Sequence, residues 1–527
     1  MTSISDILRL STLRAFASST KLTEQLLREP IYFPTWPLSP TEGRKIIKRN
    51  FNFCGYSIEM AGHINWHVDN VSVDWHREFF SYKWLQDVAA INSDKVASSF
   101  AREFINGFTL INKHDDVHEC AWELDVAGER LTHWLYYRHF VLKGGSQKFF
   151  VRYQKSLIKH IALLYHHAVE TPDYMTPNAI KGLIAASTII PSCSFMLDTA
   201  VNLLQHCLKR DILPDGGHIS QSPQHHLSFI KSMIEIRELL ETADIVFDTL
   251  NDAISTLGTM LEFFCHGDGR LALFHQNLLE NATVIERAIE LSYAKEHPPV
   301  IAQDTGYGKL KGSHICLFMR TAGQNAKKLP LGIGAIELSD AKERIFVNCG
   351  MYYGASAQWQ DALSHPSAYS TLYLQEESDT LYGPDLHQQH FIDRASRKII
   401  ELRYDISPTL IHERHIEMSA DGNICKGRDF LQLKEEAEMD GNAKIHVRFH
   451  LHPDVRCQMQ KEGNYTLTLV SGAQWQFTST FPKHISIEES VYLGYYGKPQ
   501  KTLQLIITVS FAELSGGLRW EMRKVNE

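Results

Sequence analysis

Apolar residues between residues 75 and 291 have the spacing of helices. After Ser222, four of them recur every three or four positions, on one face of a helix: Phe229, Met233, Ile236 and Leu240. Ser222 suits an N-cap, because a serine hydroxyl accepts a hydrogen bond from free N–H groups of the first helical turn. We therefore predict helices over 152–169 and 219–243 within an all-α region.

From about residue 306 the period of the pattern falls to two. In the segment KIHVRFHL, four apolar residues alternate with polar ones: Ile445, Val447, Phe449 and Leu451. This alternation is typical of strands that bury one face. Turn-forming residues such as those of 421–423 (Asp-Gly-Asn) separate the runs, so we predict an antiparallel β-sandwich.

The change of period suggests where the chain divides. Pro298 and Pro299 lie at the change, and prolines favour a stiff, non-helical connector. We predict an α+β multidomain protein with a helical domain over 1–295, a linker over 296–305 and a β-sandwich over 306–527.

Composition narrows the class. A chain of 527 residues with 44% apolar content is long enough for two or three domains. Its formal charge of -8 is spread along the sequence without a basic patch, which argues against nucleic acid as a partner. The nine cysteines form no CxxC pair and are expected to be reduced. Charged residues interrupt every apolar run near the N-terminus, so we expect an amphipathic helix there, no signal peptide and no membrane span.

The segment DGGHISQSPQHH, residues 215–226, concentrates candidate chemistry. Its glycine pair and Pro223 predict a loop that enters a new helix, and that loop carries His218, Gln224, His225 and His226. Histidine near neutral pH serves as an acid, a base or a donor to an anion. The alternative is that these histidines only cap and pack the start of the helix.

The order of several motifs resembles the heparinase II/III family of bacterial polysaccharide lyases. They are AWELDVAGERLTHW (121–134), DGGHISQSP, FFCHGDGRLALFH (263–275), DTGYGKL, RIFVNCG (344–350) and RFHLHPDV. The resemblance implies an incomplete (α/α) toroid followed by antiparallel sheets. It also implies β-elimination on a uronic-acid sugar, in which a base removes the C5 proton and an acid protonates the leaving oxygen.

The resemblance also suggests which residues act. His225 and His226 match the position of the family's carboxylate-neutralising and catalytic side chains, with His218 and Gln224 as flanking substrate contacts. A second loop, CHGDGRLALFHQ (265–276), lies in the region from which relatives use a tyrosine; here His275 would substitute, although it would equally suit a solvated turn. Tyr369 is a further candidate for proton transfer, or else a strand tyrosine packed at a sheet edge.

The family's zinc site is expected to be lost. Where active relatives have a histidine-rich segment, this chain has LPLGIG at residues 329–334. Asn348 replaces a metal-binding aspartate. Tyr369 replaces a histidine, with His365 nearby as a possible substitute. Because zinc needs three or four His, Cys or carboxylate ligands, we predict no cofactor.

A second histidine group lies on the predicted strand at 445–452. His450 and His452 are two residues apart and share a strand face, a geometry that can bind a metal. A solvated or groove-facing strand explains them without one. In that case Arg448 and His450 would line a groove for an anionic sugar.

These observations favour a lyase that cleaves a uronic-acid-containing polysaccharide of the heparin, heparan or alginate type. The alternative is a catalytically inactive relative that binds an acidic polysaccharide or oligosaccharide. A glycoside hydrolase would need two facing carboxylates, for which Asp215 and Asp268 are the candidates, although both suit turns. The family implies the cell envelope or periplasm, whereas the N-terminus and the thiols favour the cytoplasm.

Overall fold

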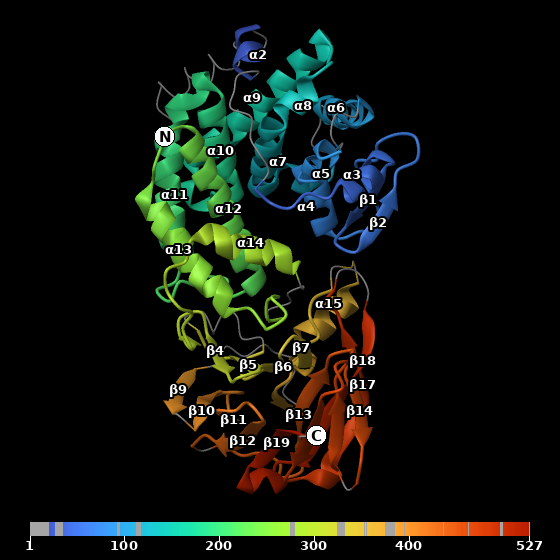
Figure 1. Ribbon diagram of the computed structural model, residues 1–527, viewed down its shortest axis with the longest axis vertical. Helices are drawn as coiled ribbons and strands as arrows, with labels where there is room; N and C mark the ends of the chain where they lie inside the picture. Colours follow the sequence, from blue (N-terminus) through green and yellow to red (C-terminus); the bar gives the residue numbers. More distant parts are fainter. Residues whose placement is uncertain are drawn as a thin grey trace. The chain divides into compact units, whose positions relative to one another are not determined.

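Figure 1 shows the computed structural model of the chain. It describes residues 20–26, 35–91, 95–111, 117–274, 280–323, 332–352, 354, 356–374, 385–394, 396–435, 437–461, 463–495 and 499–525. Within these ranges, no helix combines the length and the apolar character that crossing a membrane requires.

The first of two packing units draws on residues 1–211, 228–255 and 353–355. Its helices are α2 (Thr20–Leu26), α3 (Pro40–Ile47), α4 (Val73–Ser81), α5 (Leu85–Ala89), α6 (Lys95–Thr109), α7 (Leu124–Tyr136), α8 (Arg138–Leu142), α9 (Gln147–Glu170), α10 (Pro177–Ile189) and α11 (Leu197–Asp211). A hairpin of β1 (Asn50–Phe53) and β2 (Tyr56–Glu59) accompanies them.

Two buried charges of this unit are paired or hydrogen-bonded within it. The Lys181 ammonium is 1% exposed and contacts the carboxylates of Glu129, at 2.6 Å, and Glu235. Arg130 is fully buried and donates to the His160 ring and to two backbone carbonyls, those of Phe80 and Ala121. Because buried charges destabilise a fold unless they are paired and hydrogen-bonded, these contacts fix the packing of the helices.

The second unit draws on residues 212–227, 256–352 and 356–527. Its nine-stranded sheet runs in the order β17-β18-β13-β7-β6-β5-β4-β3, with β8 paired to β13. The strands are β3 (Ile301–Ala302), β4 (Tyr307–Lys311), β5 (Ile315–Arg320), β6 (Ile336–Asp340), β7 (Glu343–Val347), β8 (Leu372–Leu374), β13 (Lys444–Leu451), β17 (Ile485–Tyr492) and β18 (Gln500–Ser510).

An eight-stranded sheet runs in the order β14-β15-β16-β19-β12-β11-β10-β9. Its strands are β9 (Leu386–Arg394), β10 (Arg397–Asp405), β11 (Leu410–Ser419), β12 (Ile424–Leu433), β14 (Arg456–Met459), β15 (Tyr465–Thr468), β16 (Gln474–Ser479) and β19 (Leu518–Lys524). Helix α15 (Ala357–Ser364) and helix α14 (Ala282–Ser292) belong to the same unit. All the strand pairings in the two sheets are antiparallel.

Residues from both sheets form one apolar core. The predicted alternation on β13 is confirmed, since its four apolar residues are fully buried: Ile445, Val447, Phe449 and Leu451. Phe346 of β7 packs against Phe449, and Trp520 of β19 packs against both. The second unit is therefore a β-sandwich.

Helices give way to strands between Ser292 and Ile301, but packing divides the chain differently. Helix α12 (Pro223–Thr242) and helix α13 (Asp248–Phe263) each contribute residues to both units. The loop at 212–222 packs with the sandwich. So does the loop after α13, where the Lys309 ammonium binds the carbonyls of Phe263 and Cys265.

Candidate functional site

Asp215 anchors the DGG turn to the start of the sandwich. Its carboxylate accepts hydrogen bonds from the Thr305 N–H and hydroxyl, both at 2.7 Å, and from the Gly217 N–H at 3.0 Å. Gly216 has φ +86°, which other residues avoid. A Cβ on Gly217 would lie 1.8 Å from the Thr305 hydroxyl oxygen, so only glycine allows this close approach. The turn is therefore shaped by packing.

Gln221 connects the same loop to a buried guanidinium. Arg320, at the end of β5, donates to the Gln221 side-chain oxygen at 2.8 Å and to the carbonyls of Thr305 and Gly306. The Tyr307 hydroxyl donates to the Gln221 carbonyl at 2.7 Å, and the Arg320 guanidinium lies 4.9 Å from the Tyr307 ring centroid. Arg320 is fully buried, and this burial lowers its pKa. These contacts hold the loop in one conformation.

The predicted helix start is confirmed, but its histidines have different environments. The Ser222 hydroxyl accepts from the His225 N–H at 3.2 Å, as an N-cap does, and the His225 side chain is exposed. His226 is fully buried, bonds to the Leu257 carbonyl at 2.8 Å through Nε2, and packs edge-on against Phe264. Burial lowers the pKa of His226 to about 4. The prediction that His226 contacts a substrate is therefore corrected, because His226 is a neutral histidine of the core.

The flanking residues of the loop lie nearer to the surface. His218 is half-buried, and its Nδ1 contacts the Ser220 hydroxyl at 2.7 Å. Gln224 is also half-buried, and its side-chain oxygen has no hydrogen-bond partner in the described part of the chain. Their substrate contacts stay a prediction. His275 lies outside the described residues.

Tyr369 and His450 are both buried in the second unit. Tyr369 is 4% exposed, and burial raises the pKa of its hydroxyl. His450 is 2% exposed; Nδ1 contacts the Ser490 hydroxyl at 2.7 Å, and Nε2 contacts the Ser367 carbonyl at 2.9 Å. Burial lowers the pKa of His450 to about 4. The expectation that His450 lines a groove is therefore corrected, because both ring nitrogens are used inside the fold.

Arg448 is the predicted contact that stays half-exposed on β13. Its guanidinium donates to the Tyr373 hydroxyl at 2.7 Å and to the Gln504 side-chain oxygen at 3.0 Å, and it lies over the Tyr373 ring. Both partners are neutral. Among the described residues, no carboxylate lies within ion-pair distance of Arg448. Its positive charge is therefore available to an anion.

A buried acid–base network occupies the region of the expected metal site. The Glu337 carboxylate accepts hydrogen bonds from the side chains of His266, Arg344 and Asn348, at 3.1–3.4 Å. It also accepts one from the Leu273 N–H. Arg344 also binds Asp268, at 3.0 Å. Within the described ranges, no three His, Cys, Asp or Glu side chains are placed to hold one metal ion. Residues 329–331 lie outside those ranges, so the absence of zinc stays a prediction.

The carboxylates weighed for hydrolysis are also engaged. Asp215 binds Thr305, and Asp268 pairs with Arg344 and accepts from the Arg270 N–H as a turn residue does. His452, the other half of the suggested metal pair, is 7% exposed, and its Nδ1 lies 3.5 Å from the Asp454 carboxylate. The expectation of a solvated face is thus wrong for His450 and His452.

Sequence reasoning missed Gln221, Arg320, Glu337 and Arg344. A signal existed for Arg320, because it is the one charged residue of an otherwise apolar strand, whereas Glu337 and Arg344 lie on strands that contain further polar residues. A charge in a buried strand requires a partner. The partners are distant in sequence, such as Gln221, 99 positions from Arg320.

Comparisons with known proteins agree with this architecture. Two family models match, heparinase II/III N-terminus over residues 39–266 and heparinase II/III-like, C-terminal over residues 294–521. The crystal structure of heparinase III matches with a TM-score of 0.78 at 13% identity, covering 98% of this chain and 92% of that one. A heparan sulfate lyase, HepC from Pedobacter heparinus, matches with a TM-score of 0.60 at 14% identity, covering 98% and 88%.

A curated relative is FtsZ-localized protein C of Caulobacter vibrioides, 23% identical over 363 residues. The match covers 62% of each chain, so this protein spans about three-fifths of that relative's length. The two family models together cover most of the chain, and the solved structures share its helical toroid and antiparallel sandwich. The chain therefore belongs to the heparinase II/III-like family.

Proposed function

We propose that this protein binds an acidic, uronate-containing polysaccharide or oligosaccharide without cleaving it by β-elimination. The heparinase II/III-like fold, which it shares with polysaccharide lyases, supports the class of ligand. One observation supports the absence of cleavage, namely that three candidate catalytic or substrate-binding residues are at most 4% exposed: His226, Tyr369 and His450.

Elimination needs a base and an acid within hydrogen-bond reach of the sugar. His226 and His450 have their Nε2 atoms bonded to carbonyls of the fold, and burial keeps both rings neutral. The raised pKa of Tyr369 disfavours the phenolate that a base would require. Using any of these groups on a substrate would first expose it and break its packing.

Binding requires less of the site. Arg448 offers a guanidinium whose present partners, Tyr373 and Gln504, are neutral. A guanidinium matches a carboxylate in a two-point geometry, and such charged hydrogen bonds are among the strong ones. Arg448 is therefore the residue that we assign to the uronate carboxylate on this face of the nine-stranded sheet.

A lyase of the same substrate class is the second candidate, and one observation favours it. His225 is exposed on the first turn of α12, so its imidazole is accessible to a bound sugar. In that case His225 would be the base or the carboxylate-neutralising donor, with His275 as a further candidate.

The test combines an activity assay with a binding assay on heparin, heparan sulfate and alginate. We expect the wild-type protein to bind at least one polymer and to release no unsaturated uronate, which is measured by ultraviolet absorbance. Arg448→Gln should weaken binding about tenfold, as expected for a lost charged hydrogen bond. Arg456→Gln, an exposed arginine of β14, is the matched control and should bind normally.

Elimination by the wild type that is lost in His225→Ala would establish the lyase instead. Binding to none of the polymers would reject both candidates.

The compartment that accompanies this proposal is the cell envelope or periplasm, with the cytoplasm as the alternative. Fractionation of cells expressing the full chain distinguishes them. The relative from Caulobacter vibrioides is named for localisation with FtsZ and not for a reaction, which is compatible with a binding role.

A further inference from the structure

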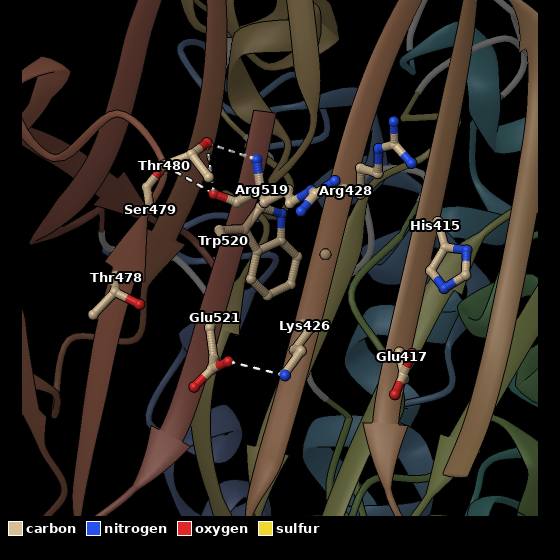
Figure 2. Close-up of a pocket in the computed structure, with 11 residues that line it drawn as sticks. His415, Glu417, Lys426, Arg428, Thr478, Ser479, Thr480, Arg519, Trp520 and Glu521 are labelled. Carbon is tan, nitrogen blue, oxygen red and sulfur yellow. Dashed lines mark hydrogen bonds and ion pairs between the residues drawn. The ribbon is translucent and has the colours of Figure 1, made fainter. Parts of the chain in front are cut away.

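A groove of about 550 Å³ lies on the outer face of the eight-stranded sheet. It crosses β11, β12, β19 and the end of β16, and Figure 2 shows the side chains that line it. Gly427 and Trp520 form part of its floor, where a Cβ on Gly427 would meet the indole at 2.0 Å. Strands rather than loops therefore position the lining residues.

Strand register arranges these residues in two rows. The first row contains His415, Arg428 and Arg519, which are opposite one another on β11, β12 and β19. Thr480 completes it, because its hydroxyl and N–H bond to the backbone of Arg519. Within the groove this row presents two guanidinium groups, an imidazole ring and a hydroxyl, and beyond His415 it continues to Glu401 on β10.

The second row lies two residues further along each strand, about 7 Å away. It contains Glu417, Lys426 and Glu521, again in register, with Thr478 opposite Glu521. Its charges alternate in sign, and Lys426 pairs with Glu521 at 3.2 Å. Each charge of this row has an ion-pair partner, since Glu417 pairs with Arg397 at 3.4 Å and Glu521 also pairs with Arg523 at 2.7 Å.

Arg428 and Arg519 have no such compensation. They are directly opposite on neighbouring strands, above the Lys426–Glu521 ion pair in Figure 2. No described carboxylate is within ion-pair distance of either guanidinium; the nearby acid of the row, Glu401, pairs with His415 at 3.0 Å. Like charges directly opposite on a sheet are unfavourable unless an anion lies between them.

We propose that this groove binds an acidic sugar unit, with its carboxylate or sulfate held between Arg428 and Arg519. The proposal rests on the proposed function for the class of ligand, but it places a second contact on the sheet opposite to that of Arg448. Two guanidinium forks offer paired donors to the oxygens of one planar carboxylate or one sulfate group. The volume falls in the range of small-ligand sites.

The second row explains why a glycan is a better fit than nucleic acid. Glu417 and Glu521 accept hydrogen bonds from the neutral hydroxyls of an adjoining sugar ring. The same carboxylates repel a strand that carries a phosphate on every nucleotide. A chain with one acidic group and several hydroxyls per unit complements both rows.

The test measures binding of heparin oligosaccharides, which carry sulfate and carboxylate, and alginate oligosaccharides, which carry carboxylate alone, to the full chain. The double variant Arg428→Gln and Arg519→Gln should bind at least one of them about tenfold or more weakly than the wild type. The matched control is Arg456→Gln with Lys483→Gln, which removes the same number of positive charges from exposed positions outside the groove. It should bind within about twofold of the wild type.

A second variant separates binding from folding. Arg519→Glu places a carboxylate opposite Arg428, so the unliganded variant should melt at or above the wild-type temperature while it loses the oligosaccharide. Equal affinity of the wild type and the arginine variants would overturn the proposal. An equal loss of affinity in the control would do the same, as would tighter binding of single-stranded DNA than of oligosaccharide at this groove. If the wild type binds no oligosaccharide, the proposed function itself fails.

Discussion

The burial of His226 makes a quantitative prediction about stability and pH. Its pKa falls from 6.5 to about 4 in the fold, chiefly because burial disfavours the charged ring. The unfolded chain therefore binds a proton more readily than the folded chain between these values. The stabilisation from this residue is complete above about pH 6.5 and is lost as the pH falls through 4.

The magnitude follows from the size of the shift. The difference between 6.5 and about 4 corresponds to about 3 kcal/mol, most of it lost at pH 4. His226→Gln removes the titrating ring and keeps an amide that can donate to the Leu257 carbonyl. We expect the variant to be less stable than the wild type at pH 7, because packing against Phe264 is lost. Its stability should fall less steeply between pH 7 and pH 4.

Urea unfolding, followed by fluorescence at several pH values, measures how steeply the free energy of unfolding changes with pH in the wild type and in the variant. A separate transition is fitted for each unit where two are resolved. His225→Gln is the matched control, since His225 is exposed beside it on the same helical turn. The control should keep the wild-type slope. Identical slopes for the wild type and His226→Gln would refute the assignment of His226 to the core and would restore it as a candidate for catalysis.

Three further predictions concern the second unit. Arg344→Met should lower the free energy of unfolding by about 3–5 kcal/mol, measured by urea unfolding, because it leaves the buried Glu337 and the half-buried Asp268 without their cation. A change below about 1 kcal/mol would show that the network is not structural. Purified protein should contain no stoichiometric zinc by elemental analysis, and about one tightly held zinc per chain would mean that a site has been rebuilt. A fragment of residues 306–527 should unfold at lower temperature than the sandwich in the full chain, because it lacks the segment 212–227; a strongly helical circular dichroism spectrum would contradict the fold.

Elements with a regular pattern were predictable from the sequence. The alternation on β13 and the N-cap at Ser222 both follow from local rules, and both are confirmed. His226 was also within reach, because it lies three residues before Phe229 and seven before Met233. That helical spacing places His226 on the buried face of the helix, whereas the chemistry of histidine suggested a catalytic site.

The rest of the site depends on partners that a single sequence does not pair. Gln221 and Arg320 are brought together only when the loop packs on the sandwich, and the Asp215–Thr305 contact spans 90 positions. The opposed arginines of the groove depend on the register between β12 and β19. Local propensity specifies neither the pairing of distant strands nor their register.

The contacts of the DGG turn bear on how activity is inferred across related proteins. Each of its three residues is required by packing: Asp215 by Thr305, Gly216 by its backbone angle, and Gly217 by the space beside Thr305. Selection for a stable fold is enough to preserve such a turn after catalysis has been lost. A search that uses DGGH as a signature will therefore collect active and inactive members alike, and the motif is a marker of ancestry rather than of reaction.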